Sequence, residues 1–225
     1  DILCSDKTGT LTRGTMQLTS VTDPDGVDDP RVLELAALAA HFQSGIRNPL
    51  DDAILAAAPT PVNWEKVDEV PFDFERRRMS VVVKHGDRLI LVVKGAPENV
   101  QSACTSFRVG DELRPLDAAA LERTLAAARE HGTRGLRTLA IAWRELPPRP
   151  SYGPADECEL VLAGWAMFSD PPSSDAAAMV AALAKDGVAL KILTGDDDAV
   201  ARHVCTATGV DTTHPDLRGR IRDMH

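Results

Sequence analysis

Aromatic side chains are scarce, at 4% of the 225 residues, so the sequence predicts a core built mainly from aliphatic side chains. The four cysteines show no C-x-x-C spacing, which indicates free thiols in a reducing compartment and neither a disulfide framework nor a zinc site. Long apolar runs are also missing, because the stretches at 35–40 and 89–93 are far too short to span a bilayer. No basic start followed by an apolar run opens the chain, so we expect no signal peptide.

Positive charge is in deficit. The sequence has 25 Lys and Arg against 34 Asp and Glu, and its net charge is −9. This balance disfavours nucleic acid as a partner. The chain begins at Asp1 and enters an apolar segment at once, so we expect a fragment of a longer protein.

Strand-like and helical patterns alternate along the chain. Two distant strand-like segments, 2–4 and 188–193, each end in a polar turn that contains glycine, as ligand-binding strands of open α/β sheets do. Between them, β-branched runs at 79–84 and 88–94 flank a hairpin signal. We therefore expect a discontinuous α/β domain from residues 1–17 and 167–225, with an α+β domain at 18–166 inserted in it.

Local patterns place the other elements. Helices are expected at 31–41, 50–58, 117–131 (with Gly132 as the stop), 173–185 and 199–208, strands at 136–143 and 160–168, and loops at 20–30 and 147–150.

The segment Asp6-Lys7-Thr8-Gly9-Thr10-Leu11-Thr12 follows the first strand and suits phosphoryl transfer. A carboxylate beside a lysine and backbone N–H groups can attack a phosphate and form an acyl phosphate. Such a site needs Mg²⁺ between carboxylate and phosphate, and it needs donors to the phosphate oxygens. The alternative is an ordinary capped turn after a strand, which any three of these residues would favour.

These seven residues resemble the phosphorylation signature of P-type cation-transporting ATPases. Lys94-Gly95-Ala96-Pro97-Glu98, Asp170-Pro171-Pro172 and Thr194-Gly195-Asp196 resemble three further motifs of that family, in the family's order. The resemblance implies that ATP phosphorylates Asp6. It also implies catalytic roles for Lys7, Thr8, Thr194, Gly195 and Asp196, and Mg²⁺ binding at Asp6 and Thr8. The fold it implies is a haloacid-dehalogenase-like Rossmannoid phosphorylation domain around an α+β nucleotide-binding domain with an antiparallel sheet.

The segment 71–80 places two phenylalanines beside three consecutive arginines. An exposed aromatic ring can stack on adenine and an arginine can meet phosphates, but a strand with buried Phe and a solvated basic edge fits equally well. The family resemblance implies ATP contacts for Phe72, Arg77, Lys94, Gly95, Arg137 and Asp51. Asp52 leaves the register at Asp51 open, and Phe74 is expected in the core.

Residues 72–83 and 41–48 look most like the bacterial magnesium-transporting subgroup, with a calcium-type pump as the runner-up because of Pro97-Glu98. The resemblance implies a parent that is an integral membrane protein. This chain would lie at the cytosolic face of the plasma membrane, with transmembrane and actuator domains of the same parent as partners. A soluble phosphatase of the haloacid-dehalogenase type with a large cap is disfavoured by Thr8, which replaces the second aspartate of those enzymes. A third reading is a nucleotide-binding module without catalysis.

The chain stops before the glycine-aspartate-glycine segment that supplies a Mg²⁺-binding aspartate in the family. We therefore expect an incomplete phosphorylation domain and a fragment that binds ATP but is inactive alone.

Overall fold

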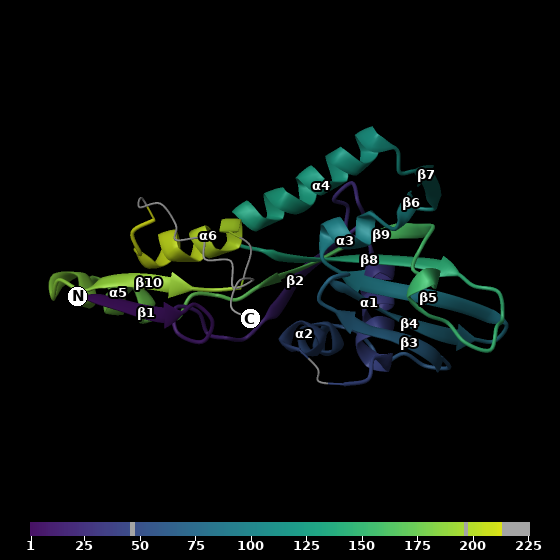
Figure 1. The fold of residues 1–225 in the computed structure, drawn as a ribbon, viewed down its shortest axis with the longest axis horizontal. Coiled ribbons are helices and arrows are strands. Elements are labelled where there is room, and N and C mark those ends of the chain that lie inside the picture. The colour runs from purple at the N-terminus through teal and green to yellow at the C-terminus, as the bar shows by residue number, and fades with distance from the viewer. Residues whose placement is uncertain (46–47, 196–197, 213–225) are drawn as a thin grey trace.

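The computed structural model describes residues 1–45, 48–195 and 198–212, and its strands form two separate sheets (Figure 1). The larger sheet has eight strands in the order β3-β4-β5-β8-β9-β6-β7, with β2 also on β9. These strands are β2 (Gln17–Thr22), β3 (Glu65–Asp73), β4 (Arg78–His85), β5 (Arg88–Gly95), β6 (Cys104–Val109), β7 (Glu112–Pro115), β8 (Arg137–Glu145) and β9 (Leu160–Ser169).

Antiparallel pairing dominates the larger sheet, as the sequence predicts. The hairpin of β4 and β5 has an unbroken register from Arg78↔Gly95 to His85↔Arg88. The exception is the β6–β9 pair, which is parallel. One edge of β9 is shared, because β6 pairs with its first residues and β2 pairs with its last.

Helices cover both faces of this sheet. Side chains alternate along each strand, so on β4 the odd residues Val81 and Val83 pack toward α1 (Pro30–Phe42), with α2 (Pro49–Ala57) on the same face. Val82 points to the other face, where α3 (Pro97–Gln101) and α4 (Ala118–Thr133) pack. The valine-rich strands are therefore buried on both faces, which explains their continuous apolar runs.

The smaller sheet pairs β1 (Ile2–Asp6) with β10 (Ala189–Leu193) in parallel, next to α5 (Ala176–Lys185) and α6 (Asp198–Thr208) (Figure 1). Its core is small and contains Leu11, Val180 and Val204. Cys4 is a small side chain in a strand-like segment that would be expected to be buried, but it is exposed, because β1 has a single neighbouring strand among the described residues.

Three predicted boundaries are wrong. Residues 20–22 belong to β2, since Val21 pairs with Ala166 although turn-forming residues follow it directly. Gly132 is buried inside α4, and Gly135, with φ +77°, takes the left-handed position after the helix instead. The helix expected from residue 173 begins at Ala176.

Candidate functional site

The carboxyl ends of β1 and β10 lie side by side. Asp6, the last residue of β1, is in register with Leu193, the last residue of β10, so Thr194 and Gly195 follow directly beside Asp6. Asp6, Thr8 and Thr194 are exposed, whereas Lys7 is buried. The structure therefore brings two of the predicted motifs to one edge of a parallel sheet. Asp196, the last residue of the second motif, lies outside the described residues.

The turn after Asp6 is bound to the chain that returns from the larger sheet. Gly9 adopts φ +78°, a left-handed conformation that lets the backbone fold back on itself. Thr12 Oγ1 donates to Asp170 Oδ2 at 2.5 Å. Backbone hydrogen bonds from Arg13 N to Pro171 O and from Ser173 N to Leu11 O reinforce this contact. Neither Thr12 nor Asp170 is among the site residues predicted from the sequence, although both lie within motifs that resemble those of the family.

A buried ion pair lies at the end of β5. Lys94 Nζ pairs with Asp51 Oδ1, and Gln43 Nε2 donates to Asp51 Oδ2 at 2.5 Å. Asp51 is fully buried and Lys94 is 4% exposed. Burial lowers the pKa of Lys94 below its usual value, although the adjacent carboxylate favours the charged form. Gln43 is a member of this group that sequence reasoning missed.

The start of α2 explains why Asp51, and not Asp52, takes this position. Asn48 caps the helix, because its Oδ1 accepts hydrogen bonds from Leu50 N and Asp51 N. The side chain of Asp51 in turn accepts a hydrogen bond from Asn48 N, which completes a capping box. Asp52 is exposed, so Asp51 is the one of the two aspartates that pairs with Lys94.

The turn between β3 and β4 exposes two aromatic rings. Phe72 is 54% exposed and Phe74 is 88% exposed, and their ring centroids lie 5.4 Å apart in an edge-to-face arrangement. The prediction that Phe74 belongs to the core is wrong, as is the alternative that Phe72 is buried. The physical reason is that Asp73 Oδ1 accepts hydrogen bonds from Glu75 N and Arg76 N, which fixes a turn where the strand would otherwise continue.

The three arginines of this turn do not act alike. Arg76 Nη1 and Arg78 Nε bind Glu157 Oε2 at 2.5 and 2.8 Å, and the Glu157 side chain is fully buried. Arg77 is exposed and adopts φ +48°. Glu157 comes from the loop before β9, so only the tertiary structure reveals that two of the three arginines are engaged in structural contacts.

Gly95 allows this turn to approach β5. A Cβ atom at Gly95 would lie 2.5 Å from the Arg77 carbonyl oxygen and 2.6 Å from Arg78 Cβ. The contact brings Arg77 next to the end of β5 that carries Lys94. Arg137 is the exposed first residue of β8 and lies three residues before Ala140, which pairs with Gly95. That interval is about 10 Å of strand, so Arg137 lies toward the same end of the sheet.

Two pockets in the described part of the chain contain none of the predicted site residues in their linings. Among residues 1–45, 48–195 and 198–212, no group of three or more His, Cys, Asp or Glu side chains could hold a metal ion. No helix in the same ranges is long and apolar enough to cross a membrane.

Comparison with known proteins identifies the family. The family model of the P-type ATPase cytoplasmic domain N matches residues 48–175, which is more than half of the chain. A magnesium-transporting ATPase, P-type 1, of Escherichia coli (strain K12) is 42% identical over 219 residues, which cover 94% of this chain and 24% of that protein. The probable cation-transporting ATPase F of Mycobacterium tuberculosis (strain H37Rv) is 30% identical over 267 residues, which cover 95% of this chain and 29% of that protein.

The chain thus spans about a quarter of the length of the magnesium-transporting relatives that it matches. Its matched residues form most of the antiparallel sheet and include Lys94, Phe72 and Arg137. The chain belongs to the P-type ATPase family and carries that family's cytoplasmic domain N.

Proposed function

We propose that this chain is the ATP-binding and phosphoryl-accepting cytosolic part of an ATP-driven magnesium pump. In this proposal, residues 18–166 form the nucleotide-binding domain. Residues 1–17 and 167–225 contribute the first and second parts of a haloacid-dehalogenase-like phosphorylation domain. The magnesium cargo rests on the printed names of relatives that are 42% identical over almost the whole chain. The remaining partners are transmembrane and actuator domains of the same parent, which places the chain at the cytosolic face of the plasma membrane.

The observation that carries the ATP-binding part is the exposed Phe72 ring near the end of β3, at the same end of the sheet as the buried Lys94–Asp51 pair near the end of β5, with β4 between these two strands. A flat aromatic ring at 54% exposure offers a stacking surface for adenine. The polar atoms of the buried Lys94 and Asp51 and of the half-buried Gln43 can form hydrogen bonds with the edge of the base. Arg77 and Arg137, exposed at the same end of the sheet, would meet the phosphates.

Asp6 is the proposed phosphoryl acceptor. Its carboxylate oxygen would form a bond to the γ-phosphorus of ATP while the bond to the bridging oxygen breaks and ADP leaves; water later hydrolyses the acyl phosphate. Lys7, Thr8, Thr194, Gly195 and Asp196 would position the transferring group. An exposed carboxylate with a threonine two residues on suits Mg²⁺, which takes one or two carboxylates together with substrate phosphates and water. Bound Mg²⁺ would neutralise charge between carboxylate and phosphate.

Calorimetric titration of the 225-residue chain with ATP tests the binding part. We expect saturable binding that is weakened about 5- to 150-fold by Phe72→Ala, because stacking on a base contributes about 1–3 kcal/mol. Phe74→Ala is the matched control, since Phe74 lies in the same turn and is more exposed. Equal affinities of the two variants, or no binding to the folded chain, would refute the proposed pocket.

Phosphoryl acceptance is tested in the complete pump. Acid-stable phosphate from labelled ATP should be lost on Asp6→Asn and retained on Asp25→Asn, which changes an aspartate of a distant turn. Phosphate that persists in Asp6→Asn would exclude Asp6 as the acceptor.

A further inference from the structure

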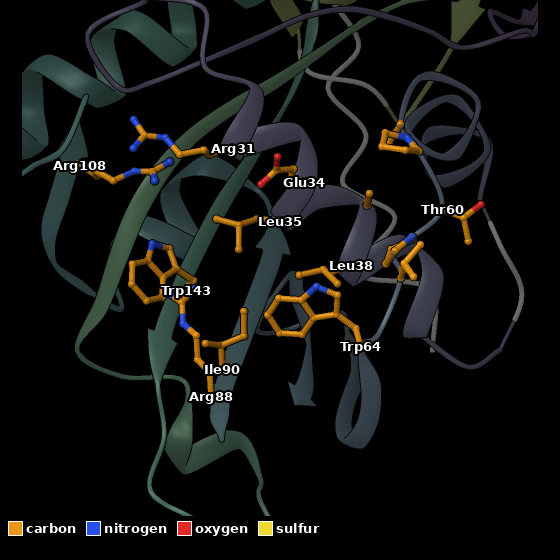
Figure 2. A pocket seen from close by; sticks show the side chains of 15 residues that line it. Arg31, Glu34, Leu35, Leu38, Thr60, Trp64, Arg88, Ile90, Arg108 and Trp143 are labelled. Carbon is orange, nitrogen blue, oxygen red and sulfur yellow. The ribbon is translucent and has the colours of Figure 1, made fainter. Parts of the chain in front are cut away.

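A pocket of about 320 Å³ lies on the α1 face of the large sheet, away from the proposed ATP site (Figure 2). Its apolar lining includes Leu35 and Leu38 from α1, Ile90 from β5, and the indoles of Trp64 and Trp143. Ile90 and Lys94 point to the same face of β5 but are four residues apart, which is about 13 Å of strand. The pocket is therefore a separate site at the opposite end of the sheet.

One end of the pocket is polar, and only some of the hydrogen-bond donors there have a partner in the described part of the chain. Figure 2 shows the guanidinium groups of Arg31 and Arg108 near one another, above the Trp143 ring in this view, and all three residues line the pocket. Arg108 Nη2 pairs with Asp29 Oδ2 at 3.1 Å. Arg108 Nε and Trp143 Nε1 are buried and have no hydrogen-bond partner in the described part of the chain. Buried N–H groups are nearly always paired in folded proteins, so two unpaired donors in one pocket indicate a missing acceptor.

Charges at the rim restrict what that acceptor can be. Arg31 already pairs with Asp29 and Asp111, Arg88 pairs with Glu145, and Glu34 is an exposed residue of the lining. These carboxylates would repel a polyanion such as a nucleotide triphosphate. A single negative charge placed between Arg108 Nε and Trp143 Nε1 avoids most of that repulsion and gains charge-assisted hydrogen bonds.

We propose that this pocket binds a small aromatic monocarboxylate. Its ring system would lie between Trp64 and Trp143 over Ile90, and its carboxylate would accept hydrogen bonds from Arg108 Nε and Trp143 Nε1. The volume is at the lower end of the usual range for small-molecule sites, which limits the ligand to one or two rings. A site so far from Phe72 and Lys94 can be occupied together with ATP.

The test uses 2-naphthoate as the probe, with 2-naphthalenemethanol and 2-naphthylmethylamine as ligands of matched shape but different charge. Calorimetry of the 225-residue chain saturated with ATP should give one saturable site for 2-naphthoate. Binding of the alcohol should be at least about tenfold weaker and binding of the amine undetectable, because only the carboxylate accepts two charge-assisted hydrogen bonds. No binding, similar binding of all three probes, or displacement of 2-naphthoate by ATP would overturn the proposal.

Two further measurements locate the site. Arg108→Lys keeps the positive charge but removes the Nε–H donor, and it should weaken 2-naphthoate about tenfold while ATP affinity stays unchanged. In the unaltered chain, the indole N–H resonance of Trp143 should shift with 2-naphthoate, whereas that of Trp165, which does not line this pocket, should not. A shift of Trp165 alone, or an unchanged affinity in folded Arg108→Lys, would contradict the assignment.

Discussion

Two charges are buried together at Lys94 and Asp51. Removing each of them from water costs several kcal/mol, and their mutual attraction with the Gln43 hydrogen bond offsets that cost only while all the partners remain. The pair also lies where the proposed adenine pocket needs polar atoms. In the proposed function, these two residues would therefore serve both stability and ATP binding.

Lys94→Met should lower the free energy of unfolding by about 3–5 kcal/mol, because Asp51 then remains buried without its cation. The double variant Lys94→Met/Asp51→Leu should recover much of this loss, since no buried charge is left. Urea denaturation of the wild type, both single variants and the double variant measures the coupling. Strictly additive effects of the two single changes would show that the pair does not interact as described.

The thiols should react with alkylating reagents in an order set by burial. Burial raises the pKa of Cys104 to about 12, although the positive charge of Arg78 opposes this, so almost none of it is thiolate at pH 8. Cys4 and Cys158 are exposed. Iodoacetamide at pH 8 followed by peptide mass spectrometry should find Cys4 and Cys158 modified first and Cys104 unmodified. Rapid modification of Cys104 in the folded protein would show that its thiol is not buried as described.

Strand β9 lies very close to the backbone of β2 at Gly164. Gly164 adopts φ +152°, and a Cβ atom there would lie 1.9 Å from the Thr22 carbonyl oxygen. The pairing of β8 and β9 slips in register at this point, so Gly164 lies at a β-bulge that lets β2 approach. The bulge therefore allows β2 to pair with β9, which is an inner strand of the larger sheet.

Gly164→Ala should destabilise the protein by more than about 3 kcal/mol, because backbone atoms on both sides of the contact must move. Gly153→Ala is the control, since nothing lies within 4 Å of its Cβ position and its backbone is extended. Thermal unfolding followed by circular dichroism compares the two. Similar melting temperatures for both variants would mean that β2 does not pack against Gly164 as described.

Local patterns predict the strongest elements well. The β4–β5 hairpin, α1, α2 and α6 are confirmed within about two residues, because apolar periodicity and turn signals coincide there. Strands β2, β3, β6 and β7 carry few apolar residues and are stabilised by long-range pairing, so the sequence analysis did not name them. The Glu157 contacts were missed for the same reason, since they join residues distant in sequence. The exposure of Phe74 follows instead from the local turn at Asp73, which the turn-forming residues of this segment do not signal strongly enough to predict.

At the scale of the whole molecule, the two sheets are connected at few points. The Thr12–Asp170 hydrogen bond and the backbone bonds around it join the two chain segments that cross between the sheets. Helix α4 also contacts α6 of the smaller sheet (Figure 1). Motion of one sheet against the other, which carrying ATP from Phe72 to Asp6 would require, must therefore act through these contacts.

Thr12→Val should loosen the smaller sheet selectively. It leaves Asp170, which is 9% exposed, without its hydroxyl donor, at a cost of about 1–3 kcal/mol. Hydrogen exchange followed by mass spectrometry should show faster exchange in β1 and β10 and unchanged exchange in β4 and β5. Uniformly faster exchange in both sheets would indicate that they unfold as one unit.

The most direct test of the account is an ATP titration of the isotope-labelled chain followed by backbone and indole NMR. We predict that amide signals of Phe72, Lys94 and Gly95 move with a common affinity, whereas the indole signals of Trp64 and Trp143 at the far end of the sheet stay in place. Shifts confined to Trp64 and Trp143, with Phe72 and Lys94 unaffected, would contradict the proposed nucleotide site.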